Sequence, residues 1–309
     1  MKRASCLFFA IAPLATLAVF LWGPSSGSDD FRSKNKESGQ SETGGTGGTA
    51  DWERDKKTAE SDALDERIAK LPPGLAAPDK RELALQLVST AHGSALDWQE
   101  MYGSISDSGE GAGYCAGIAG FCSGTNDMLA LVKAYTKEQP DNELASYLPA
   151  LREVNGSDSH EGLDPDYPEA WADEAEKPAM RKAQDAALDR LYFKPAVRIA
   201  KIDGLGTLGQ FMYFDAMLQH GPGADESGFY SIRRAAMKKA DTKAAGGDEK
   251  AYLEAFLDIR RDVIKQAKRT SQRDTSRIDN AQRVFLRDGN LELKTPLTWE
   301  MYGDTFRVP

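Results

Sequence analysis

Four side chains between residues 83 and 127 have the types and spacing to do chemistry together. They are His92, Glu110, Cys115 and Asp127. An imidazole and a carboxylate can act as general acid and general base on the two sides of a bond that water cleaves. A thiol beside a histidine could instead form a nucleophile and its base, and Glu110 could complete a metal site with them, although no ligand-spacing motif supports a metal.

The segment around these residues resembles the active-site segment of the family 46 chitosanases, which are inverting hydrolases of the lysozyme superfamily. It reads LALQLVSTAHGSALDW at 83–98 and GSISDSGEGAGYCAGIAGFCSGTND at 103–127. The family pattern is a helix ending in Ala-Glu, then Leu-Asp-Trp, Gly-Asp-Gly-Arg-Gly-Tyr-Thr and Gly-Phe-Cys-Ser-Gly-Thr-Gly-Asp. The likeness resumes at 189–196, 204–223, 246–261 and 274–286. It implies a mainly helical α+β, lysozyme-like fold of two lobes, with a small β-sheet and a substrate cleft between the lobes.

The sequence departs from this pattern at the reacting positions. His92 stands where the family has its glutamate acid, and Glu110 where it has its aspartate base. Cys115 replaces the threonine that holds the attacking water, and Ala112 replaces an arginine. Inverting glycosidases use two carboxyl groups about 6.5–9.5 Å apart.

Each substitution weakens the family reaction in a different way. An imidazolium such as that of His92 can be a general acid at mildly acidic pH, yet it adds positive charge beside a cationic substrate. The extra methylene of Glu110 moves its carboxylate by about an ångström, which can cost about a hundredfold in rate. A thiol at Cys115 is a weak hydrogen-bonding partner and a poor nucleophile for glycosyl transfer. We expect weak, altered or absent hydrolysis.

The resemblance also implies residues that bind substrate and support the site. Asp127 matches a carboxylate that grips a glucosamine amine, although it could equally be a charge in the first turn of a helix. Asp215, Arg260 and Arg277 match a salt-bridge network behind the base. Trp98 matches a position that supports the lobe by packing in its core.

The charge of the chain restricts its partners. The net charge is −9 and the isoelectric point is about 5.1. An acidic protein is poorly suited to nucleic acid, but it would attract a cationic amino-sugar polymer such as chitosan.

The chain begins with the composition of an export signal. Lys2 and Arg3 precede the uncharged run 7–22, which small residues follow. The run is shorter than the roughly 20 residues of a membrane-spanning helix and contains Pro13, so a cleaved signal peptide at 1–27 is expected rather than an anchor.

The remaining chain divides into a linker and a domain. Residues 28–75 are expected to be a disordered, low-complexity linker with a short helix at 58–71, and residues 76–309 to form the chitosanase-like domain. The mature protein is expected to be secreted, extracellular and monomeric, with no membrane contact. Two cysteines then remain, Cys115 and Cys122. Export would permit a disulfide, but Cys122 matches a lone cysteine of the family, so two free thiols are expected.

Periodicity and capping signals predict the elements. Asp79 and Glu82 would form a capping box at the start of a helix that ends near His92. Thr125 would cap the next helix and place Asp127 in its first turn. Short strands are expected within 102–121, and further helices at 196–219, 230–240 and 248–269.

Three functions remain open. The first is a secreted chitosanase that hydrolyses β-1,4 linkages between glucosamine residues with inversion and with weak or altered activity. The second is a chitosan-binding pseudoenzyme without catalysis. The third is a hydrolase of another amino-sugar polymer, such as a peptidoglycan strand. No cofactor and no metal ion is expected.

Overall fold

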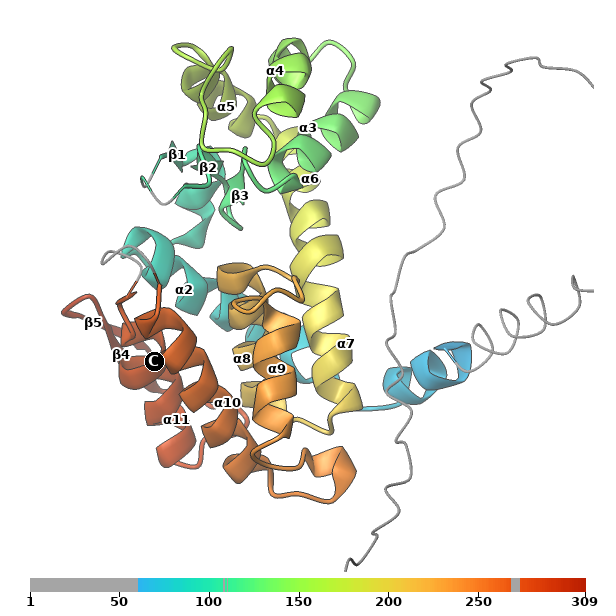
Figure 1. Ribbon diagram of the computed structural model, residues 1–309, viewed down its shortest axis with the longest axis vertical. Helices are drawn as coiled ribbons and strands as arrows, with labels where there is room; N and C mark the ends of the chain where they lie inside the picture. Colours follow the sequence, from blue (N-terminus) through green and yellow to red (C-terminus); the bar gives the residue numbers. More distant parts are fainter. Residues whose placement is uncertain (1–60, 108, 110, 268–272) are drawn as a thin grey trace, which may run out of the picture. The chain divides into compact units, whose positions relative to one another are not determined.

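The computed structural model describes residues 61–309 except 108, 110 and 268–272. These residues form a mainly helical α+β fold with two small antiparallel sheets (Figure 1), which confirms the predicted fold class. The predicted signal peptide and residues 28–60 of the predicted linker lie outside the described residues. In the part of the chain described, no helix is long and apolar enough to cross a membrane.

The first lobe contains the three-stranded sheet and four helices (Figure 1, upper part). Its core is anchored by Trp171, which is fully buried and donates its indole N–H to the carbonyl of Tyr102. The elements are β1 (Ile105–Ser106), β2 (Cys115–Ala116), β3 (Phe121–Cys122), α3 (Asp127–Glu138), α4 (Leu148–Glu153), α5 (Tyr167–Ala175) and α6 (Pro178–Leu188).

The second lobe is built around α8, which is buried along most of its length. Helix α2 belongs to this lobe. Its Thr90 Oγ1 accepts the indole N–H of Trp299 in β4. The elements are α2 (Pro78–Gly93), α8 (Thr207–His220), α9 (Phe229–Met237), α10 (Glu249–Lys265), α11 (Arg283–Arg287), β4 (Leu297–Met301) and β5 (Asp304–Val308).

One continuous helix over residues 178–202 joins the lobes (Figure 1). It consists of α6, a π-helical segment at Asp189–Phe193, and α7 (Lys194–Ile202). A second π-helical segment, Arg277–Gln282, leads into α11. Such segments shift the direction of the side chains that follow and occur often at functional sites.

The structure confirms several predicted elements. Helix α2 ends at Gly93, so His92 lies in its last turn. Strands β1 and β2 fall within 102–121, and β3 begins at the last residue of that range. Asp127 lies in the first turn of α3.

Three local predictions were wrong. Helix α2 has Ala77 at its N-cap and Pro78 at its first position, so no capping box forms, and Glu82 instead accepts the indole N–H of Trp98. The N-cap of α3 is Asn126 rather than Thr125, whose hydroxyl donates to Asp127.

The third error concerns the helix expected at 196–219. The chain breaks at 203–206 into α7 and α8, and Gly204 takes a positive φ of 76° there. The sequence signal was the pair Gly204 and Gly206, which ends one helix and begins another.

The folded chain reaches further toward the N-terminus than predicted. Residues 61–69 are helical, and Asp65 forms an ion pair of 2.6 Å with Arg198 of α7. Leu75, placed in the linker by the sequence, is fully buried and donates its N–H to Gln210 Oε1 at 2.9 Å.

We predict that Leu75→Ala lowers the free energy of unfolding by about 2–5 kcal/mol, because it removes a fully buried side chain and leaves a cavity. Leu71→Ala is the matched control, since Leu71 is 46% exposed. Chemical denaturation of the two variants measures the difference. Equal stability would show that Leu75 does not belong to the core.

Candidate active site

His92 lies in the last turn of α2 and faces the sheet. A Cβ added to Gly120, in the turn between β2 and β3, would lie 4.0 Å from His92 Cε1. The residue is open to solvent, yet the surrounding protein lowers its pKa to about 4. Desolvation is the largest cause and the Arg277 charge the second, while Asp215 raises the pKa. His92 is therefore neutral at neutral pH, although a helix C-terminus favours the charged form.

Behind His92 lies a buried ion-pair network. Asp215 on α8 accepts hydrogen bonds from Arg260 at 2.6 Å and from Arg277 at 2.8 Å. Gln282 also donates to Asp215, at 2.6 Å. The predicted network of Asp215, Arg260 and Arg277 is thus present, and Arg277 and Gln282 both come from the second π-helical segment.

The network fixes the charge of its members. Burial alone would raise the pKa of Asp215, but Arg277 and Arg260 lower it to about 2. The ionised carboxylate therefore stabilises the fold at pH values above about 4, and this stabilisation is lost as the pH falls through the folded-state pKa near 2. One carboxylate with two guanidinium groups leaves one surplus positive charge in the interior.

His220, at the end of α8, lies on the other side of this network. Its Nε2 accepts a hydrogen bond from Arg260 Nε at 3.3 Å. Its pKa is lowered to about 3, first by desolvation and then by the Arg260 charge.

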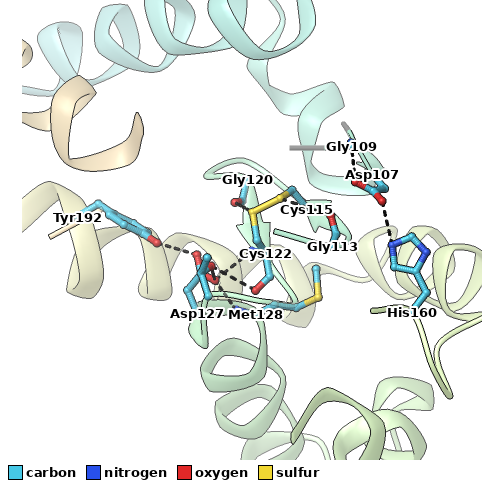
Figure 2. The surroundings of a disulfide bond; sticks show 11 residues. Asp107, Gly109, Gly113, Cys115, Gly120, Cys122, Asp127, Met128, His160 and Tyr192 are labelled. Carbon is cyan, nitrogen blue, oxygen red and sulfur yellow. Dashed lines mark hydrogen bonds and ion pairs between the residues drawn. A yellow bond between two sulfur atoms is a disulfide. The ribbon is translucent and has the colours of Figure 1, made fainter. Parts of the chain in front are cut away.

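Cys115 and Cys122 form a disulfide, so the prediction of two free thiols was wrong (Figure 2). The two residues are direct partners in the β2–β3 ladder, where facing side chains lie close enough to bond. Their separation by seven positions across a Gly-rich turn was the sequence signal that could have found the pair. Cys115 therefore offers neither a nucleophilic thiolate nor a metal ligand, and the described residues contain no metal-binding cluster.

Asp127 is held by four protein donors (Figure 2). Its Oδ1 accepts from the backbone N–H of Cys122 and of Met128 and from the Thr125 hydroxyl, and its Oδ2 accepts from the Tyr192 hydroxyl at 2.7 Å. Tyr192 belongs to the first π-helical segment and was not singled out from the sequence. Asp127 is thus an acidic residue in the first turn of α3, as one of the two interpretations expected. The binding of an amine by Asp127 stays a prediction.

Two predicted site residues remain, Trp98 and Glu110. Trp98 is half-buried and packs on Tyr102 with ring centroids 5.7 Å apart, as expected for a supporting residue. Glu110, the predicted base, lies outside the described residues. Its distance from His92 and its role therefore stay predictions.

Sequence reasoning missed His160. The imidazole stacks on Tyr114 with centroids 3.9 Å apart, and its Nε2 lies 3.1 Å from Asp107 Oδ2 (Figure 2). No motif marks this histidine, because its partners are 46 and 53 positions away in the chain.

Comparison with known proteins identifies the family of the chain. The model of glycosyl hydrolase family 46 matches residues 86–297. A chitosanase of Streptomyces sp. (strain N174) is 52% identical over 239 residues, which cover 77% of this chain and 85% of the relative. A chitosanase of Bacillus subtilis (strain 168) is 34% identical over 226 residues, covering 71% and 81%.

Solved structures of chitosanases agree with this family assignment. Chitosanase OU01, co-crystallised with substrate, superposes with a TM-score of 0.74 at 49% identity, covering 76% of this chain and 98% of that one. The Gynuella sunshinyii GH46 chitosanase GsCsn46A, in complex with chitotetraose, gives 0.71 at 32% identity, covering 78% and 99%.

The pKa of His92 tests the electrostatics of the site. We predict that Arg277→Gln raises it from about 4 toward the ordinary value near 6.5, because a nearby positive charge is removed. Titration of the imidazole resonances by NMR measures this, with the exposed Arg287→Gln as control. An unchanged midpoint would remove Arg277 from the account.

The disulfide makes a separate prediction. Without reductant, Cys115 and Cys122 should not react with iodoacetamide, and after reduction both should react. Cys115→Ser should lower the free energy of unfolding by about 2 kcal/mol, as expected for a short closed loop. Peptide mass mapping and denaturation measure the two effects, and alkylation of the unreduced protein at either cysteine would contradict the bond.

Proposed function

Because the chain belongs to glycosyl hydrolase family 46, we propose that it binds chitosan and hydrolyses the β-1,4 linkages between glucosamine residues slowly and with inversion. His92 would be the acid and Glu110 the base. The relatives named chitosanase, two of them at 50% identity or more, support the substrate. The protein would be secreted, a location that suits both the apolar run 7–22 and the disulfide.

The observations that carry the proposal of slow hydrolysis are the histidine at position 92, where the family pattern has a glutamate, and the Cys115–Cys122 disulfide. A general acid must be protonated, and the lowered pKa of His92 leaves most of the imidazole neutral at neutral pH. The family arrangement of two carboxyl groups does not share this limit, because a carboxylic acid in such a site commonly has a raised pKa.

The disulfide adds a second cost. A sulfur in the Cys115–Cys122 bond has no hydrogen to donate, and it is a weaker acceptor than a hydroxyl. The attacking water would therefore be held less well than by a threonine, and the longer side chain of Glu110 would change the approach of the base.

A second candidate function is chitosan binding without hydrolysis. The lowered pKa of His92 and the Cys115 disulfide favour it, since a neutral imidazole is no general acid and a bonded sulfur has no hydrogen to donate to water. The intact Asp215 network supports a preserved site under either function. A third candidate, hydrolysis of another amino-sugar polymer, draws no specific support from the described residues.

Release of reducing ends from chitosan tests the proposal. The purified full chain should release product slowly, and the rate should rise as the pH falls from 7 toward 4, because the protonated fraction of His92 rises. His92→Ala should abolish release and keep binding. His92→Glu should raise the rate by about a hundredfold, since a positioned acid contributes about 10²–10⁴-fold.

Two outcomes would change the conclusion. Binding without release by the natural chain, followed by release from the triple variant His92→Glu, Glu110→Asp and Cys115→Thr, would establish the binding function. If the natural chain and the triple variant both fail to bind chitosan and to release product, chitosan is excluded as the ligand.

A further inference from the structure

Tyr302 differs from the other exposed apolar side chains of the described residues. Three large ones are exposed there, Leu71, Met237 and Tyr302, and Tyr302 is both the most exposed, at 51%, and the one aromatic residue among them. Its hydroxyl donates to the carbonyl of Ala91 at 3.0 Å. A single exposed apolar side chain is ordinary, but this hydrogen bond fixes the orientation of a ring that is open to solvent.

The backbone at Tyr302 is also unusual. Its φ is 52°, and the φ of the next residue, Gly303, is 93°. These two residues form the turn of the β4–β5 hairpin, because Met301 pairs with Asp304. Two successive positive φ values are typical of a type I′ turn, whose first position favours asparagine, aspartate or glycine. A bulky residue in this conformation costs free energy, so the needs of the turn do not explain the ring.

The hairpin is fixed on α2 (Figure 1). Trp299 of β4 is 2% exposed and donates its indole N–H to Thr90 Oγ1 at 3.0 Å. The Trp299 ring stacks on Phe306 of β5, with centroids 5.9 Å apart. Together with the bond from Tyr302 to Ala91, the hairpin therefore contacts two consecutive residues in the last turns of α2.

The bond to Ala91 places the Tyr302 ring beside position 92. Ala91 directly precedes His92, which is exposed in the last turn of α2. The last four carbonyls of a helix have no partner within it, so a donor from elsewhere satisfies one of them here. Because that donor is the tip of the Tyr302 side chain, the ring lies next to the residue at the predicted acid position.

A tyrosine ring suits the apolar face of a pyranose sugar. In a β-1,4-linked glucosamine unit the axial C–H groups form this face, while the hydroxyl and amino groups lie around the edge. Stacking removes apolar surface from water on both sides and needs no charge. An uncharged contact fits this place, because the Arg277 charge that lowers the pKa of His92 also repels an ammonium group.

We propose that Tyr302 is a sugar-binding platform, on which one glucosamine unit of chitosan stacks beside position 92. The inference rests on the proposed function, which supplies the β-1,4-linked polymer, and it adds a binding residue from the β4–β5 hairpin to the predicted Asp127 of α3. The two residues recognise different features of the sugar. Tyr302 contacts the apolar face, whereas Asp127 would bind the amine.

Binding of a glucosamine hexamer to the full chain tests the platform. Calorimetric titration is done at about pH 7, where hydrolysis is slowest. Tyr302→Asn should raise Kd about tenfold, because it removes the stacked ring. Asparagine adopts a positive φ readily, so the turn is kept. Tyr302→Phe should change Kd by less than about twofold, since the ring remains. Met237→Ala on α9 is the control, being the other exposed large side chain that lies in a helix of the second lobe.

Salt separates stacking from charge attraction. The ratio of Kd for Tyr302→Asn to Kd for the natural chain should be the same at about 0.05 M and about 0.5 M sodium chloride, because salt screens charges and not stacking. The corresponding ratio for Asp127→Asn should fall as the salt concentration rises. A Tyr302→Asn ratio that falls in the same way would overturn the proposal.

Two further outcomes would overturn it. The first is an unchanged Kd in Tyr302→Asn. The second is an equal loss of affinity in Tyr302→Asn and Tyr302→Phe, because the hydroxyl bond to Ala91 would then support binding and the ring would not. If Tyr302→Asn does not fold, Tyr302→Gly replaces it with the same expected result, since glycine takes positive φ without strain.

The two proposals can fail separately. Binding of the hexamer without release by the natural chain removes hydrolysis from the proposed function and leaves every measurement on Tyr302 in force. An unchanged Kd in Tyr302→Asn, in a chain that binds and hydrolyses chitosan, overturns the platform alone. Absence of binding by the natural chain overturns both.

Discussion

The site depends on one buried carboxylate. Asp215 is 2% exposed and binds two arginines from different elements, Arg260 of α10 and Arg277 of the second π-helical segment. A buried ion pair costs desolvation energy, and removing one partner typically costs about 3–5 kcal/mol because the other charge is then uncompensated. The three residues therefore fix α8, α10 and the segment Arg277–Gln282 relative to one another. That segment lies beside α2, since Leu87 and Ala91 line a small cavity together with Asp215 and Arg277.

The same network determines what can occupy position 92. Desolvation is the largest cause of the lowered pKa values of His220 and His92, and the arginine charges of the network lower them further. An imidazolium at His92 would add a second uncompensated charge. The surroundings of His92 therefore favour the neutral imidazole at neutral pH.

Much of the fold was predictable from the sequence, because helices of this length carry a clear apolar period. The end of α2 near His92 and the positions of β1 and β2 within 102–121 were predicted correctly. The errors came from local backbone preferences that overrode the apolar period. Pro78 takes the first position of α2, so no capping box forms there, and Gly204 ends α7 where the apolar period predicted one helix over 196–219. The Asp215 network was found through the family pattern alone, and Tyr192 and His160 were missed because long-range pairing leaves no local signal.

The departures from the family pattern are not independent. The Cys115–Cys122 bond joins β2 to β3 at the residue whose backbone N–H holds Asp127. Asp127 in turn accepts the Tyr192 hydroxyl from the helix that links the lobes. The disulfide therefore fixes the strand beside Asp127. Under the proposed function, substrate binding would depend on Asp127 and hydrolysis on residues 92, 110 and 115. Binding and hydrolysis would then separate in this chain, because the bond supports the first and position 115 lacks the threonine hydroxyl of the family pattern.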